Sequence, residues 1–185
     1  MAEDLELAVG REEIIKLTLL QSAFFLAVAL GYGLIFGDLS SIGLTTEQWE
    51  ISLAAGMGLF VLAVPVLYLP RAMGYRNPLE EILATKLTVR DIVGLNFVVS
   101  LGEELFFRGF LIGLLGVIPS AVIFGLMHYI GYESWVEVVY ALAVGLVLGF
   151  VFKYMLPNVL FPFIFHFLAN TYALLLMRRR LQSQE

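Results

Sequence analysis

The feature that most constrains this chain is a succession of long apolar segments, each bounded by charged or turn-forming residues. A helix needs roughly 20 apolar residues to cross the ~30 Å hydrocarbon core of a bilayer. We predict about six crossing segments, the fourth of them short: residues 14–36, 51–69, 92–118, 120–130, 136–155 and 159–177. The fold class expected is therefore all-α, a polytopic membrane helix bundle.

Composition narrows the function classes further. The chain is 60% hydrophobic and 15% charged, whereas soluble domains carry about 25% charged residues. A net charge of -5 argues against nucleic-acid binding, and the absence of cysteine excludes disulfides and thiol nucleophiles. We expect one integral membrane domain over residues 1–185, with a polar N-terminal segment at 1–13 and a basic, polar tail at 178–185.

Basic residues set the expected orientation, because loops rich in Lys and Arg stay on the cytoplasmic side. With the amino terminus inside and six crossings, nine of the eleven basic residues fall on that side: Arg11, Lys16, Arg71, Arg76, Lys86, Arg90, Arg178, Arg179 and Arg180. Both termini are predicted to be cytoplasmic, in a multi-pass protein of the cell membrane. Between the second and third crossings, residues 71–89 are expected to form an amphipathic surface helix or a structured loop.

Three charged residues interrupt the third apolar segment: Glu103, Glu104 and Arg108. Each charge at the centre of a membrane helix costs about 2.5–3.5 kcal/mol when unpartnered. Glu104 and Arg108 are four residues apart and can pair on one helix face, whereas Glu103 points about 100° away. The pairing predicts that Glu103 is the free carboxylate.

The two histidines, His128 and His166, also lie within apolar segments, and Asn170 shares a helix face with His166. At 1.5 Å per residue, Glu103 lies roughly 17 Å from one surface and the histidines roughly 12–14 Å from the other. In a ~30 Å core these levels coincide. Each residue alone has a structural interpretation, but together they indicate a polar functional pocket.

Three short motifs at these positions resemble those of a known family. They are EExxxR from Glu103 to Arg108, FxxxH from Phe124 to His128, and HxxxN from His166 to Asn170. In this order, within residues 101–170, they are similar to the core motifs of the CPBP family, the CAAX-protease and bacteriocin-processing (Abi) intramembrane proteases.

The resemblance implies an all-helical intramembrane endopeptidase. In it Glu103 and His128 activate a water molecule, His166 and Asn170 hold the oxyanion, and Glu104 with Arg108 supports the site. No cofactor is expected. The alternative is a zinc enzyme that uses Glu103, His128 and His166 as ligands. The expected partners are a membrane-associated peptide or protein substrate and the lipid bilayer, with no nucleic acid.

Two other classes stay open at this stage. A scaffold or chaperone of the same fold could bind peptides without cleaving them, and a small proton-coupled transporter would also use buried Glu and His. The natural substrate, the cleavage site and the oligomeric state are not determined by the sequence.

Overall fold

The computed structural model describes residues 10–72 and 77–183, and every regular element in that part of the chain is a helix. The elements in chain order are α2 (Arg11–Phe36), η1 (Leu39–Ile42), α3 (Trp49–Ala72), α4 (Pro78–Lys86), α5 (Val89–Glu104), η2 (Leu105–Leu111), α6 (Ile112–Leu115), α7 (Val117–Tyr132), α8 (Trp135–Tyr154) and α9 (Leu160–Gln182). The predicted all-α fold class is confirmed.

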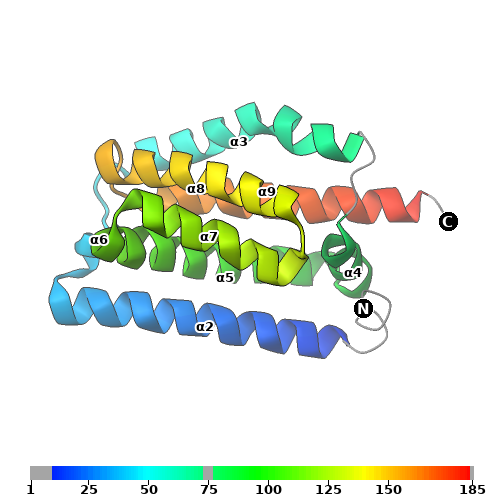
Figure 1. The fold of residues 1–185 in the computed structure, drawn as a ribbon, viewed down its shortest axis with the longest axis horizontal. Coiled ribbons are helices and arrows are strands. Elements are labelled where there is room, and N and C mark those ends of the chain that lie inside the picture. The colour runs from blue at the N-terminus through cyan, green and yellow to red at the C-terminus, as the bar shows by residue number, and fades with distance from the viewer. Residues whose placement is uncertain (1–9, 73–76, 184–185) are drawn as a thin grey trace.

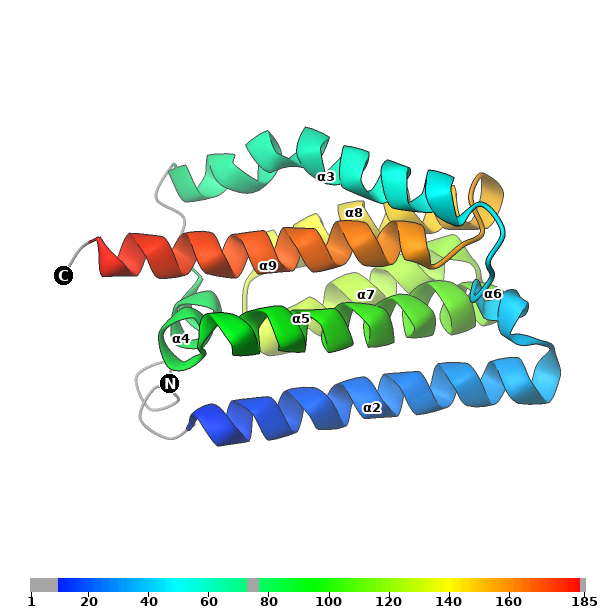
Figure 2. The same cartoon turned by 180° about the vertical axis from the view of Figure 1, so that it is seen from behind.

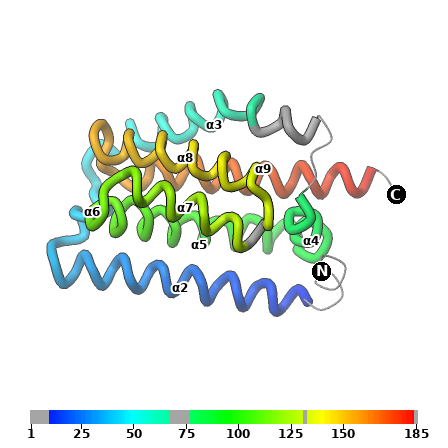
Figure 3. The backbone as a smooth tube through the Cα atoms, in the orientation of Figure 1, coloured from blue at the N-terminus to red at the C-terminus, as the bar shows by residue number. Residues whose placement is uncertain are grey.

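The long helices lie side by side and run back and forth between the same two ends of the bundle (Figure 1). Helix α2 forms one edge and α3 the opposite edge, with α5 and α9 on one face and α7 and α8 on the other (Figures 1 and 2). The start of α2, the end of α9 and the short helix α4 share one end, and α6 lies at the other, as the backbone tube also shows (Figure 3).

Among the described residues, four helices are long and apolar enough to cross a membrane: Arg11–Phe36, Trp49–Val66, Trp135–Tyr154 and Leu160–Gln182. Val117–Ile130 is a shorter apolar helix. These helices support the predicted membrane bundle, while the count of six crossings and the cytoplasmic termini stay predictions. Of the two polar ends, residues 1–9 and 184–185 lie outside the described residues; the remainder is largely helical, since α2 begins at Arg11 and α9 extends to Gln182.

The boundary between the third and fourth apolar segments differs from the expected one at residues 118–120. The helical path of α5, η2 and α6 ends at Leu115, and α7 begins at Val117. Gly116 separates them with φ +89°, a conformation that glycine adopts without steric cost. Pro119 lies in the first turn of α7, where its missing N–H is tolerated.

Residues Leu105–Leu111 form a π-helix, η2, which continues α5 without a break. Its carbonyl at Phe107 accepts a hydrogen bond of 2.9 Å from the buried Ser120 hydroxyl of α7. Such wide turns are rare and frequently mark functional sites. Here the π-helix directly follows Glu103 and Glu104 and contains Arg108.

The segment expected to be a surface helix or a structured loop contains helix α4, which packs mainly against α9. Asn77 caps its start by accepting hydrogen bonds from the N–H groups of Leu79 and Glu80. Thr88 and Asp91 form a capping box at the start of α5. Caps of this kind satisfy N–H groups that a helix leaves free at its first turn. The residues next to each start therefore determine where α4 and α5 begin.

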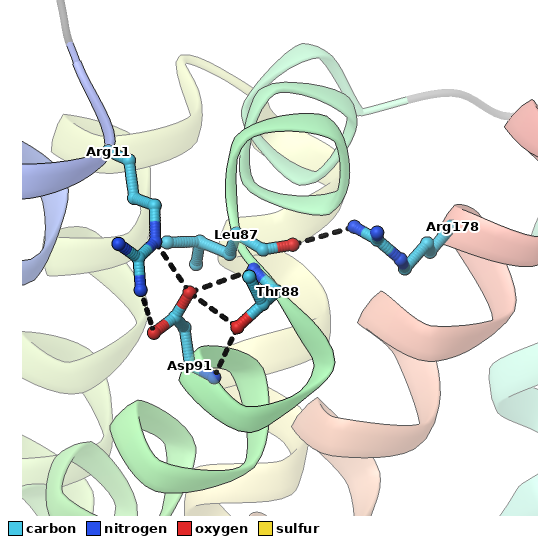
Figure 4. A network of polar contacts seen from close by, with 5 residues as sticks. All are labelled: Arg11, Leu87, Thr88, Asp91 and Arg178. Atoms are coloured by element: carbon cyan, nitrogen blue, oxygen red, sulfur yellow. Dashed lines mark hydrogen bonds and ion pairs between the residues drawn. The ribbon is translucent and has the colours of Figure 1, made fainter.

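Two arginines from helices that are far from this segment in the sequence form hydrogen bonds with the turn between α4 and α5 (Figure 4). Arg11 of α2 donates two hydrogen bonds to Asp91, of 2.8 and 2.7 Å. Arg178 of α9 donates to the carbonyls of Ala84 and Leu87, at 2.8 and 2.6 Å. The hydrogen bonds from Arg11, and then those from Thr88, hold the pKa of Asp91 well below its usual range. The turn is thus tied to both α2 and α9.

Gly109 provides a test of the packing around η2. A Cβ at this position would lie 2.7 Å from the carbonyl oxygen of Ile42, too close for either backbone to accommodate without moving. Gly109→Ala should therefore lower the free energy of unfolding by about 1–3 kcal/mol, the usual cost of overpacking. The measurement is the thermal midpoint of the purified protein in detergent.

Gly113→Ala is the matched control, because the nearest atom to its added Cβ would be the Tyr32 hydroxyl at 3.7 Å, an ordinary contact. This variant should stay within about 1 kcal/mol of the wild type, since Ala is preferred over Gly in helices. Equal midpoints for the two variants would contradict the assigned contact between η2 and η1.

Candidate active site

The centre of the bundle holds a chain of three buried polar side chains. Arg108 Nε lies 2.9 Å from Glu104 Oε2, and the other oxygen of Glu104, Oε1, lies 2.7 Å from His166 Nδ1. Glu104 and Arg108 are 0% and 2% exposed, and His166 is 7% exposed. One carboxylate therefore joins the end of α5 to both η2 and α9.

Arg108 is held mainly by charge and by an aromatic face. Arg108 Nε and Glu104 Oε2 are close enough to form an ion pair, but their geometry is not that of a hydrogen bond. The Nη1 and Nη2 atoms of Arg108 have no hydrogen-bond partner among the described residues. The guanidinium carbon lies 4.6 Å from the centroid of the Phe124 ring. A desolvated cation over an aromatic ring gains about 2 kcal/mol, which offsets part of the cost of burying this charge.

Glu103 is the second carboxylate of the site and comes from the last turn of α5. Its Oε2 lies 3.8 Å from His166 Nε2, on the opposite side of the imidazole from Glu104. An ionised carboxylate only accepts hydrogen bonds, so in the 2.7 Å contact with Glu104 the imidazole proton is on Nδ1 of His166, which donates it. His166 is thereby oriented with Nε2 toward Glu103.

His128 comes from α7, one turn after Phe124. Its Nδ1 lies 2.8 Å from the carbonyl oxygen of Phe124, so this nitrogen carries the hydrogen and donates it. The Phe124 ring packs against both imidazoles, with centroid distances of 4.6 Å to His128 and 6.1 Å to His166. Phe124 therefore spaces the two histidines and fixes the tautomer of one of them.

A cavity of about 370 Å³ opens beside these residues. Glu103, His128 and Asn170 line it, together with Phe107 and Phe124. The rest of its wall is mostly apolar and comes from α2, α4, α5, α7 and α9: Ile14, Thr18, Gln21, Leu79, Glu80, Leu83, Leu87, Ile92, Leu95, Asn96, Val99, Met127, Ile130, Ala173 and Leu174. His166 does not line the cavity itself, but it lies 3.8 Å from Glu103, which does.

The structure thus brings the six residues selected from the sequence into one region, with two differences in their contacts. Glu104 contacts His166 as well as Arg108, and Glu103 faces His166 instead of being a free carboxylate. Sequence reasoning also missed Asn96, which lines the cavity from the same face of α5 as Glu103. The seven-residue spacing of these two polar residues within an apolar helix is the signal that could have identified it.

The described residues contain no group of three or more His, Cys, Asp or Glu side chains that could hold a metal ion. The proposed zinc ligands Glu103, His128 and His166 are near one another without forming such a group. Nδ1 of each histidine is engaged, by Phe124 in one case and by Glu104 in the other, as it commonly is in metal-binding histidines too, so Nε2 is the nitrogen left for chemistry in either scheme.

Apolar helices that enclose a buried acid–base cluster beside a cavity are typical of an integral membrane enzyme. Residues 85–172 match the family model described as type II CAAX prenyl endopeptidase Rce1-like. This match supports the resemblance of residues 85–172 to the CPBP family of CAAX-type membrane proteases.

The matched segment runs from the end of α4 into α9 and contains all six site residues selected from the sequence. A search of curated proteins and a search of solved structures found no match. The matched family indicates a peptidase, and the apolar helices indicate a membrane protein.

Proposed function

We propose that this protein is an intramembrane endopeptidase of the cell membrane that hydrolyses a membrane-associated peptide or protein with a water molecule activated by Glu103 and His128. The observation that carries the proposal is the convergence of Glu103, His128 and Asn170 on one cavity beside the Arg108–Glu104–His166 chain. Peptide hydrolysis needs a base, a proton donor and donors for the oxyanion, and this set contains all three.

In the proposed reaction Glu103 removes a proton from water while the water oxygen bonds to the carbonyl carbon of the scissile peptide bond. The tetrahedral intermediate then carries a negative charge on the former carbonyl oxygen. Glu103 returns the proton to the nitrogen as the C–N bond breaks, which releases an amine and a carboxylic acid; the acid then passes its O–H proton to the amine or to solvent. His128, on the same cavity, holds the water beside Glu103.

Asn170 and His166 are the proposed donors to the oxyanion. Asn170 lines the cavity and lies one helical turn after His166 on α9. An oxyanion donor contributes about 3–4 kcal/mol to the transition state. To donate to the oxyanion, His166 must already carry a second ring proton, on Nε2, taken up from solvent before the reaction begins; the two glutamates beside the ring, at 2.7 and 3.8 Å, offset the positive charge of this imidazolium.

Glu104 acts in this scheme as a positioning residue. It is fully buried, accepts the Nδ1 proton of His166 and is paired with Arg108. Carboxylates in this position fix the tautomer and the ring orientation of a working histidine.

The proposal is a glutamate mechanism without a metal. Its support is that the described residues contain no group of three or more His, Cys, Asp or Glu side chains placed to hold a metal ion. Purified protein washed with a chelator should retain its activity. A stoichiometric zinc content that rises and falls with activity would reverse this assignment.

The experiment that tests the function compares wild type and Glu103→Ala in their native membranes. Mass spectrometry of newly formed terminal peptides across the membrane proteome should identify termini produced only by the wild type. Identical termini in both samples, with peptides still captured by the purified protein, would favour a non-catalytic scaffold. Proton flux in liposomes without any peptide would instead favour a transporter.

A further inference from the structure

Asn96 is a polar side chain in the cavity that the proposed chemistry does not use. It lies in the middle of α5, is 8% exposed, and lines the same cavity as Glu103. Its Nδ2 is buried without a hydrogen-bond partner among the described residues. A buried amide N–H without a partner costs about 1–3 kcal/mol, so a group in the cavity that accepts from Asn96, water or a bound ligand, would stabilise this arrangement.

The neighbours of Asn96 on α5 that line the cavity are apolar. They are Ile92, Leu95 and Val99. Sites that recognise a ligand commonly have this composition, a mainly apolar wall with a few polar groups that fix orientation. The carboxamide can both donate and accept, which matches the N–H and C=O groups of a peptide backbone.

The distance from Asn96 to Glu103 gives the position of that ligand group. Seven residues of α-helix return to nearly the same face and rise roughly 10 Å. An extended peptide advances about 3.3 Å per residue. A substrate lying along this face of α5 with its scissile bond at Glu103 would therefore place the backbone of the third residue from that bond beside Asn96.

We propose that Asn96 binds the backbone of the substrate about three residues from the scissile bond and so sets the register of cleavage. The inference rests on the proposed peptidase function. It assigns to Asn96 a role in substrate binding and none in the chemical step.

The test uses the full-length protein in nanodiscs and a fluorogenic, lipid-anchored peptide built on a cleavage sequence from the proteome comparison. Asn96→Ala should raise KM about tenfold, the effect of losing one hydrogen bond to substrate, while kcat stays within about twofold. Ser100→Ala is the matched control. Ser100 lies one turn away on α5, its hydroxyl is equally without a partner among the described residues, and it does not line the cavity. This variant should leave both constants unchanged.

A second measurement changes the substrate and compares the wild type with Asn96→Ala. Two forms of the peptide carry an ester in place of the backbone amide at the third residue, one on each side of the scissile bond. The wild type should show a raised KM for one of them, and Asn96→Ala should not distinguish that form from the parent peptide.

The outcomes separate the two proposals. With Glu103-dependent cleavage present, an unchanged KM in Asn96→Ala, or a lower thermal midpoint with no change in KM, overturns the role of Asn96 and leaves the peptidase intact. Equal sensitivity of Asn96→Ala and wild type to the esters overturns it as well. Absence of any Glu103-dependent cleavage overturns both proposals.

Discussion

Replacing Glu103 with glutamine should lower kcat about 10²–10⁴-fold, the usual contribution of a positioned general base. Glutamine keeps the size of the side chain and removes its ability to take a proton from water. The Glu103 side chain is 13% exposed and lies 3.8 Å from His166, outside hydrogen-bond distance, so the variant should still fold. The measurement is kcat on the lipid-anchored peptide, with the thermal midpoint recorded for the same preparation.

Glu50→Gln is the control for this prediction. Glu50 is exposed in the first turn of α3 and is not in the cavity lining. The same chemical change there should leave kcat unchanged. Wild-type turnover by Glu103→Gln would refute its role as the base. A loss of activity in the Glu50 variant would show that the assay reports membrane insertion and not the chemistry.

Arg108→Ala should be the most destabilising single substitution of the site, with a loss of about 3–5 kcal/mol. Its removal leaves Glu104 fully buried with only His166, among the described residues, as a possible cationic partner, and empties the space over the Phe124 ring. The variant should therefore accumulate poorly in membranes, and its thermal midpoint in detergent should fall by several degrees.

The double variant Glu104→Gln/Arg108→Met is the informative comparison. It removes both charges, so no uncompensated ion stays buried, and it should be closer to wild type in stability than Arg108→Ala. It should nevertheless have low activity, because the neutral amide that replaces the Glu104 carboxylate cannot accept from His166 as an anion. If Arg108→Ala and the double variant were equally unstable, the packing of Arg108 on Phe124 would matter more than its charge.

The sequence predicted much of this arrangement because apolar run length and helical rise are properties of single segments. Segment lengths predicted a helix bundle, and the count of residues from each segment end placed Glu103, His128 and His166 at a common level. The Glu104–Arg108 pair followed from a spacing of four on one helix. These inferences need no knowledge of how helices turn toward one another.

The remaining features depend on that rotation. Whether His166 faces Glu103, Glu104 or both is decided by the angle of α9 about its own axis, which residue spacing does not specify. The π-helix at Leu105–Leu111 changes the direction of Arg108 relative to a regular α-helix. Asn96 was missed for a similar reason, because its importance comes from helices α2, α4 and α9 closing a cavity around it.

The hydrogen bonds between Arg178 and the α4–α5 turn have a consequence for biosynthesis. Arg178 reaches the carbonyls of Ala84 and Leu87 from the final helix, which also contributes His166 and Asn170. While a nascent chain is still emerging from the ribosome, it lacks this helix, and Glu104 has only Arg108 as a partner. The hydrolytic set that we propose is completed only when the last segment docks, so partly synthesised chains should be inert toward neighbouring membrane polypeptides.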